Sequence, residues 1–158
     1  MNMNAQLISR FYEAFGRRDA ETMAACYHPD VEFSDPVFPD LKGNEAGDMW
    51  RMLAGRATDL VVRYEVKSAD DKRGSAHWDA DYTFAKTGRK VNNSIDAQFE
   101  FDNGLIRRHR DHFDLWRWSR MALGMPGVLL GWSPVVRNKV RKQAAEGLAA
   151  FRSKAGRA

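Results

Sequence analysis

The stretch HRDHFDLW, residues 109–116, concentrates side chains that can move protons or hold a metal ion. It places two histidines and two aspartates, His109, Asp111, His112 and Asp114, within eight residues. Imidazole and carboxylate groups are the usual general acids and bases of enzymes, and they also bind divalent ions. Because side chains alternate across a strand, His109 and Asp111 should share one face while His112 and Asp114 share the other. A single metal centre built from all four is therefore excluded.

Two alternate sets of side chains compete for the interior face of this run. The set that contains His109 and Asp111 starts with Leu105 and ends with Phe113 and Leu115, whereas the other set carries two arginines and fewer apolar groups. The more apolar set should face the core, because the register of a strand is fixed by the face that it buries. We therefore expect His109 and Asp111 to point inward.

The predicted secondary structure that positions these residues changes from helices to strands along the chain. Apolar residues recur at helical spacing in residues 7–15, 22–27 and 46–53, and Asp19 is the expected N-cap of the second helix. Four strand-like runs follow at 60–69, 74–85, 89–101 and 105–116, separated by turn-forming residues. This order predicts an α+β domain whose helices pack on one face of a curved, mostly antiparallel sheet.

Alternation also selects the interior side chains of the two middle strands. Trp78 and Tyr82 belong to the apolar set of residues 74–85, and Phe99 belongs to that of residues 89–101. Asn93 is an amide on an otherwise apolar face. Because a buried amide needs hydrogen-bond partners, Asn93 is either a satisfied structural group or a pocket group.

Length and composition indicate one compact domain. The chain has 158 residues, a single cysteine, Cys26, and a net charge of +4, so it can bury a core but cannot form an intrachain disulfide. Neither a signal peptide nor a run of about 18 apolar residues occurs, which favours a cytoplasmic protein. Residues 107–158 hold 12 Lys/Arg against 3 Asp/Glu. Without a nucleic-acid motif, this excess is typical of a solvated basic face, so we expect no nucleic-acid binding.

The order of elements resembles that of a known superfamily. Two helices, VEFSDPV, a third helix and a four-strand meander ending in GLIRRHRDHFDLW resemble the nuclear transport factor 2-like superfamily, particularly its SnoaL-like branch of polyketide cyclases, ketosteroid isomerases and limonene epoxide hydrolases. The resemblance covers roughly residues 5–125. It implies a cone in which a bent sheet wraps a pocket that three helices close. Members of this superfamily run different chemistries there, or none, so the fold does not fix the function.

The isomerase motif carries over only in part. The segment SDP is similar to the motif whose aspartate shuttles a proton, which nominates Asp35. The oxyanion-stabilising tyrosine falls on Phe11, with Tyr12 one residue away, and the second oxyanion-hole acid falls near Ala97, with Asp96 on the opposite side of the strand. Loss of these donors would remove a large electrostatic contribution, which disfavours ketosteroid isomerisation.

The epoxide hydrolase motif also carries over in part. The stretch RDHFD is similar to the one that holds the water-activating aspartate, which falls on Asp111. The arginine and second aspartate of those enzymes fall on Trp78 and Ala80, and a one-residue gap would move them to Asp79 and Asp81. That shift restores one acid but no arginine, so the triad is incomplete.

The resemblance and the residues together predict an apolar pocket centred on Asp111, His109 and Asp35. The side chains expected to contact a substrate are Trp78, Tyr82, Asn93, Phe33, Phe99, Phe113 and Tyr12. Asp111 or Asp35 would act as general base, and His109 as partner acid or orienting group. The reaction would be an isomerisation, cyclisation or hydration of a small apolar carbonyl compound or epoxide, and none of these needs a cofactor. Two alternatives remain, a structural role for His109 and Asp111 and a ligand-binding or dimerising module without catalysis.

The rest of the chain suggests other contacts. His77, Asp79 and Asp81 could ligate a metal, but they lie on the face assigned outward, where surface alternation is the simpler account, so no metal site is expected. We expect a homodimer through that outward face. The SnoaL-like domain should span 1–125, with residues 126–158 forming a helical extension packed on it and covering the cone mouth or a sheet edge. The apolar stripe of the C-terminal helix is largely Ala and Val, so stable membrane association is not expected.

Overall fold

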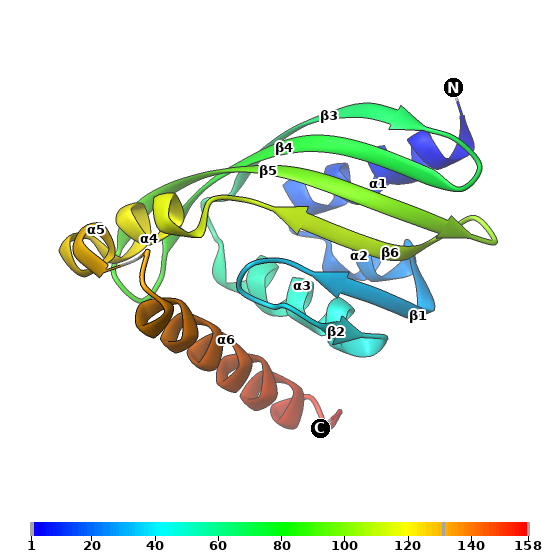
Figure 1. Cartoon of the computed structure of the whole chain (residues 1–158). Coiled ribbons are helices and arrows are strands. Elements are labelled where there is room, and N and C mark those ends of the chain that lie inside the picture. The colour runs from blue at the N-terminus through cyan, green and yellow to red at the C-terminus, as the bar shows by residue number, and fades with distance from the viewer. Residues whose placement is uncertain (1, 131, 158) are drawn as a thin grey trace.

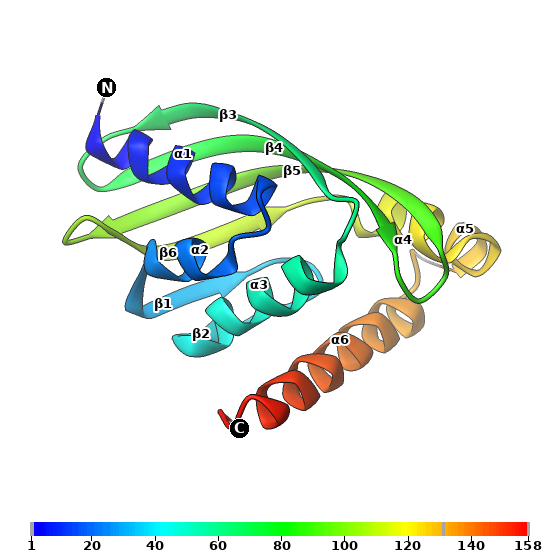
Figure 2. The same ribbon diagram turned by 180° about the vertical axis from the view of Figure 1, so that it is seen from behind.

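The computed structural model describes residues 2–130 and 132–157 and has helices on one face of a curved sheet (Figures 1 and 2). The helices are α1 (Met3–Gly16), α2 (Ala20–Ala25), α3 (Asn44–Arg56), α4 (Leu115–Leu123), α5 (Met125–Leu130) and α6 (Pro134–Lys154). The strands are β1 (Tyr27–Ser34), β2 (Leu41–Lys42), β3 (Val61–Ala69), β4 (Arg73–Phe84), β5 (Arg89–Asp102) and β6 (Leu105–His112). The predicted α+β class is confirmed.

The sheet has the order β2-β1-β6-β5-β4-β3. All neighbouring strands are antiparallel except β1 and β6, which are parallel. Figure 2 shows α1, α2 and α3 on the concave side of this sheet. The shape follows from the right-handed twist of long strands, which curls an open sheet around the helices that it buries.

Local sequence signals fix the helix ends. The Asp19 side chain accepts a hydrogen bond from the Thr22 backbone N–H at 3.1 Å, which confirms the predicted N-cap of α2. Gly43 precedes α3 with a φ of +57°, a left-handed conformation that favours glycine. The second helix is shorter than predicted, because Tyr27 leaves the helix and starts β1.

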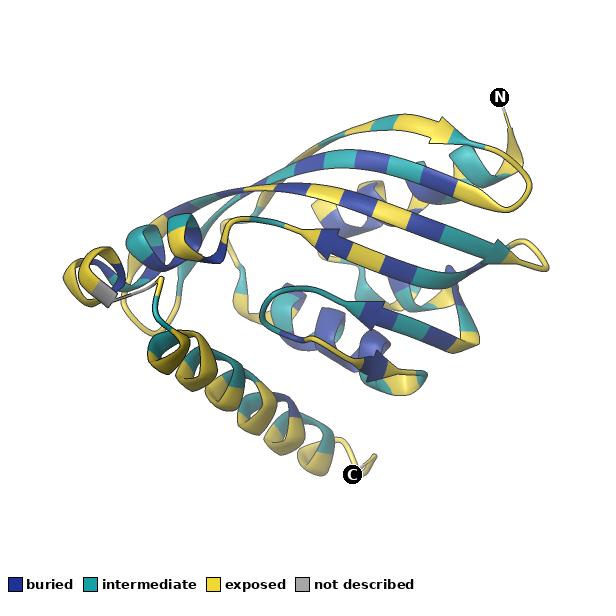
Figure 3. Ribbon diagram, viewed as in Figure 1, coloured by how far each residue is buried: buried dark blue, intermediate teal, exposed yellow. Residues whose placement is uncertain are grey.

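The inward faces of β4 and β5 follow the predicted alternation (Figure 3). In β6 the predicted inward set of alternate side chains is correct for His109 and Asp111, which are buried, but wrong at the start of the strand. Glu100 pairs with Arg108 whereas Phe101 pairs with Ile106, so β6 contains one extra residue there. This bulge reverses the alternation and buries Ile106 in place of the expected Leu105.

The C-terminal segment folds back onto the domain. Trp118 and Ala122 of α4 pack against Val91 of β5, and Leu148 of α6 joins the main core. No helix within residues 2–130 and 132–157 combines the length and apolar character needed to cross a bilayer.

Candidate functional site

The centre of the candidate site is a hydrogen-bonded pair on β6. Asp111 and His109 are both buried, and β6 aligns them with Ala97 and Phe99 of β5. His109 Nε2 lies 2.9 Å from Asp111 Oδ1. Two residues apart on one strand face, the imidazole and the carboxylate are held by the backbone in contact with each other.

Two further side chains extend this pair into a buried chain of hydrogen bonds. Trp50 of α3 donates its indole N–H to the Tyr27 hydroxyl over 2.8 Å, and that hydroxyl lies 2.8 Å from His109 Nδ1. Burial raises the pKa of Tyr27 well above its ordinary value, so its hydroxyl keeps its proton. Since an indole N–H can only donate, Tyr27 accepts from Trp50 and can donate to Nδ1. With Nδ1 facing the Tyr27 hydroxyl, Nε2 is the ring nitrogen that faces Asp111.

One oxygen of Asp111 accepts these protein hydrogen bonds. Oδ1 accepts a hydrogen bond from His109 Nε2 at 2.9 Å and a longer one from the Trp78 indole N–H at 3.4 Å. Among the described residues, Oδ2 accepts no side-chain hydrogen bond, although Asp111 lines a cavity. The second oxygen is thus available to a molecule in that cavity.

A second carboxyl group faces the same cavity from the loop after β1. Asp35 Oδ1 accepts the backbone N–H groups of Val37 at 2.7 Å and Phe38 at 2.5 Å. Desolvation by burial raises its pKa to about 7, the Phe38 and Val37 hydrogen bonds act in the opposite direction, and the nearby charge of Asp111 raises it further. Asp35 can therefore hold a proton near neutral pH.

The cavity has a volume of about 700 Å³ and a largely apolar wall. This volume is within the range of small-molecule sites. Beside the two carboxyl groups, the side chains that line it include Phe15, Trp50, Trp78, Ile95, Asn93, Tyr82, Phe113, Trp118, Leu123 and Val140. The Tyr82 hydroxyl accepts the Trp118 indole N–H at 2.9 Å and keeps its own proton to donate.

The cavity brings together six of the ten residues predicted for the site. These are Asp111, Asp35, Trp78, Tyr82, Asn93 and Phe113. His109, Phe33, Phe99 and Tyr12 do not line it, which corrects the prediction. Alternation predicts on which face of the sheet a side chain lies. It does not predict which side chains on that face are covered by α1 and α3 and which are left to line a cavity.

The four excluded side chains pack together behind the cavity wall. The rings of Phe99 and Phe33 lie 4.5 Å and 5.1 Å from that of His109. Tyr12 lies 5.6 Å from Trp78, and its buried hydroxyl has no hydrogen-bond partner among the described residues. His109 consequently lies behind the cavity wall, in contact with the lining residue Asp111.

Sequence reasoning missed the supporting groups Tyr27 and Trp50. Trp50 was visible on the apolar stripe of the third helix, but nothing in its spacing showed that its N–H reaches a tyrosine. Tyr27 was assigned to a helix. The contact between them depends on how α3 crosses β1, which the sequence pattern does not specify.

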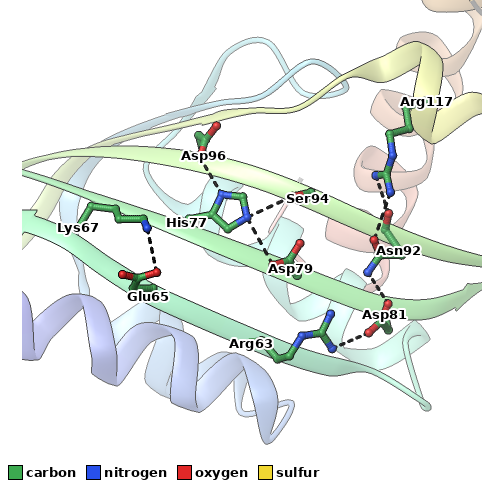
Figure 4. A network of polar contacts seen from close by, with 10 residues as sticks. All are labelled: Arg63, Glu65, Lys67, His77, Asp79, Asp81, Asn92, Ser94, Asp96 and Arg117. Atoms are coloured by element: carbon green, nitrogen blue, oxygen red, sulfur yellow. Dashed lines mark hydrogen bonds and ion pairs between the residues drawn. The ribbon is translucent and has the colours of Figure 1, made fainter.

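The outward face of the sheet carries the predicted His77, Asp79 and Asp81, but in ion pairs (Figure 4). His77 contacts Asp96 at 2.8 Å and Asp79 at 3.4 Å, and Asp81 contacts Arg63 at 2.7 Å. Asp79 and Asp81 therefore point away from the cavity, and no gap in the alignment brings them to Asp111. Within the described ranges, no group of three His, Cys, Asp or Glu side chains is arranged to hold a metal ion.

Comparisons with solved structures identify the same fold elsewhere. A nuclear transport factor 2-like protein of unknown function from Burkholderia pseudomallei is 22% identical, with a TM-score of 0.66 over 77% of this chain and 98% of that one. An LEH-like epoxide hydrolase of M. tuberculosis is 19% identical, with a TM-score of 0.61 over 80% and 95%. TerC, co-crystallised with polyporic acid, is 19% identical, with a TM-score of 0.64 over 76% and 98%.

No curated protein sequence matches the chain significantly. The model of the SnoaL-like domain matches residues 8–109, which hold α1 from Ile8 onward, α2, α3, the strands β1 to β5 and β6 as far as His109. The order of helices and strands that suggested this resemblance is found in the folded structure. The chain belongs to the SnoaL-like domain family.

Proposed function

We propose that the protein is a cofactor-independent enzyme that isomerises, cyclises or hydrates a small apolar carbonyl compound or epoxide. The observation that carries this proposal is the placement of Asp111. Its Oδ1 is held by His109 and Trp78, while the carboxylate opens onto a 700 Å³ apolar cavity.

Asp111 would act as the general base. As a carboxylate on the wall of the cavity, it can accept a proton from a carbon next to a carbonyl group or from a water molecule. His109 would be a positioning residue, since its Nε2–H fixes the carboxylate from behind. The Tyr27 hydroxyl would keep Nδ1 occupied, so that Nε2 stays the nitrogen that faces Asp111.

Asp35 would act as the general acid. With a pKa of about 7 it can hold a proton at neutral pH and donate it to the carbonyl or epoxide oxygen of the substrate. Two carboxyl groups whose environments separate their proton affinities are a recurrent arrangement for acid and base roles. Similarity to an epoxide hydrolase fold supports the proposal without identifying the reaction.

The test compares conversion by wild-type protein and the Asp111→Asn variant on a panel of apolar ketones, enones and epoxides. The amide oxygen of Asn can accept the same His109 and Trp78 hydrogen bonds, so the fold should persist. We expect kcat/KM to fall by about 10²- to 10⁴-fold, as is typical of a lost general base. Asp71→Asn, an exposed residue in the β3–β4 turn, is the matched control and should leave conversion unchanged.

Two results would contradict the proposal. Equal conversion by wild-type protein and Asp111→Asn would remove Asp111 from the chemistry. Tight binding of the panel compounds without conversion by wild-type protein would favour the alternative, a ligand-binding module.

A further inference from the structure

We infer that the cavity takes an amphipathic substrate whose apolar, carbonyl-bearing end enters first and whose anionic group stays at the rim. This inference rests on the proposed function and names the substrate class of the same site. It is carried by the distribution of charge along the cavity wall.

The charged groups of the cavity differ in their exposure to solvent. Asp35 and Asp111 are the two acids among the lining residues, and Asp111 is buried. Arg56 and Lys86 are the two cations among them, and both are exposed at the mouth. The two acids of the wall are thus buried or part-buried, whereas the two cations are exposed to solvent.

The basic rim is built from three separate elements on one side of the molecule (Figure 2). Arg56 is the last residue of α3, Lys86 lies in the turn between β4 and β5, and Gly147 of α6 lies beside the Arg56 guanidinium. A β-carbon at Gly147 would lie 3.9 Å from that guanidinium, so α6 approaches Arg56 without covering it.

Both rim cations are free to meet a ligand. Within the described residues neither Arg56 nor Lys86 forms an ion pair or a side-chain hydrogen bond, in contrast to Arg51, Arg63, Arg108 and Arg152. The Asp59 carboxylate accepts hydrogen bonds from the backbone N–H and the hydroxyl of Thr83.

The same charges fix the direction of binding. An anionic group inserted first would lose its hydration in an apolar chamber and meet the carboxylate of Asp111, both of which are unfavourable. With the apolar end inserted, the carbonyl group reaches Asp111 and Asp35 while the anion remains hydrated between Arg56 and Lys86. A substrate with an apolar, carbonyl-bearing body and one terminal carboxylate or equivalent anion fits both the carboxyl groups inside the cavity and the cations at its rim.

The test uses a matched pair of fluorescent probes, 11-(dansylamino)undecanoic acid and its methyl ester, titrated into the full chain. Wild-type protein should bind the acid about 3- to 10-fold more tightly than the ester, the size expected for two exposed charge contacts, and 0.5 M NaCl should reduce this preference. The double variant Arg56→Gln/Lys86→Gln should lose the preference while its affinity for the ester stays unchanged.

The control is Lys72→Gln/Arg73→Gln, which removes the same charge from exposed residues at the β3–β4 turn and the start of β4 and should keep the preference. Equal binding of acid and ester by wild-type protein would overturn the inference but leave the role of Asp111 intact. Equal loss of preference in both double variants would also overturn it, because net charge alone would then explain the effect. Binding of neither probe would contradict the inference together with the ligand pocket of the proposed function.

Discussion

At the scale of single residues, the site depends on how buried polar groups are paired. A carboxylate that leaves water must find hydrogen bonds, or its pKa rises until it takes up a proton. One oxygen of Asp111 accepts two side-chain hydrogen bonds, whereas one oxygen of Asp35 accepts two backbone N–H groups of its own loop. Alternation predicted that Asp111 faces inward, and the family resemblance nominated Asp35. Neither indicated that His109 lies behind Asp111, because alternation does not describe depth.

Asp35 should make the stability of the protein depend on pH. Its folded pKa of about 7 lies above its ordinary value of 3.8. The folded state therefore holds this proton more tightly than the unfolded state, and the resulting stabilisation is complete below about pH 4 and lost as pH rises through about 7. Three pKa units correspond to about 4 kcal/mol as an upper limit.

The variant Asp35→Asn keeps an oxygen for the Val37 and Phe38 N–H groups but cannot ionise. We expect its free energy of unfolding, measured by urea denaturation, to exceed that of wild-type protein by about 1–4 kcal/mol at pH 8, with the gap closing towards pH 4. A gap that is the same at both pH values would show that Asp35 does not titrate near neutrality.

At the scale of elements, Asp19 predicted the start of α2, and alternation predicted the inward faces of β4 and β5. The fourth predicted strand was too long, because β6 ends at His112 and α4 begins at Leu115. Two further features escaped this reasoning. The bulge in β6 reverses which of Leu105 and Ile106 is buried, and α6 is held in place by ion pairs between residues about 100 positions apart in the chain. Neither leaves a periodic signal, since both depend on contacts between distant segments.

The ion pairs of α6 converge on one buried acid of α3. Asp48 is fully buried and accepts guanidinium groups of Arg152 at 3.0 Å, Arg157 at 2.7 Å and Arg51 at 2.9 Å. Burial opposes its ionisation, but the hydrogen bonds from Arg157, Arg152 and Arg51 outweigh burial and keep the pKa of Asp48 below its ordinary value.

Removing the two C-terminal arginines should release α6 from the cavity mouth. In Arg152→Gln/Arg157→Gln, Asp48 keeps only Arg51, and an under-compensated buried carboxylate should lower the free energy of unfolding by about 2–4 kcal/mol. Amide hydrogen exchange should accelerate in α6 more than in α3. Lys139→Gln/Lys142→Gln, exposed on the same helix, is the control, and equal exchange in both variants would refute the anchoring role.

At the scale of the whole molecule, the cone separates two surfaces of different chemistry. The concave side holds the core and the apolar cavity, whereas the convex side of β3, β4 and β5 presents charged and polar side chains (Figure 4). The family resemblance predicted the cone and its pocket. The extent of the SnoaL-like domain to residue 125 and the separate status of residues 126–158 remain predictions.

The convex face should join two copies of the chain. Its charges of both signs suit a two-fold interface, in which the same patch meets itself. Sedimentation equilibrium at micromolar concentration should give twice the chain mass of 18.0 kDa. Ser94→Glu places a new carboxylate beside Asp79 and Asp96 and should shift the protein towards monomer, whereas a monomeric wild-type protein would contradict the interface.

The central claim is that Asp111 and Asp35 act together on a molecule inside the cavity. Its most direct test is a crystal structure of Asp111→Asn with a compound that the wild-type protein converts. The account predicts the reacting carbon, or a water molecule, about 3–3.5 Å from the side chain at position 111, and the carbonyl or epoxide oxygen within hydrogen-bond distance of Asp35. A compound seated with its reacting atoms at the rim, or outside the cavity, would contradict it.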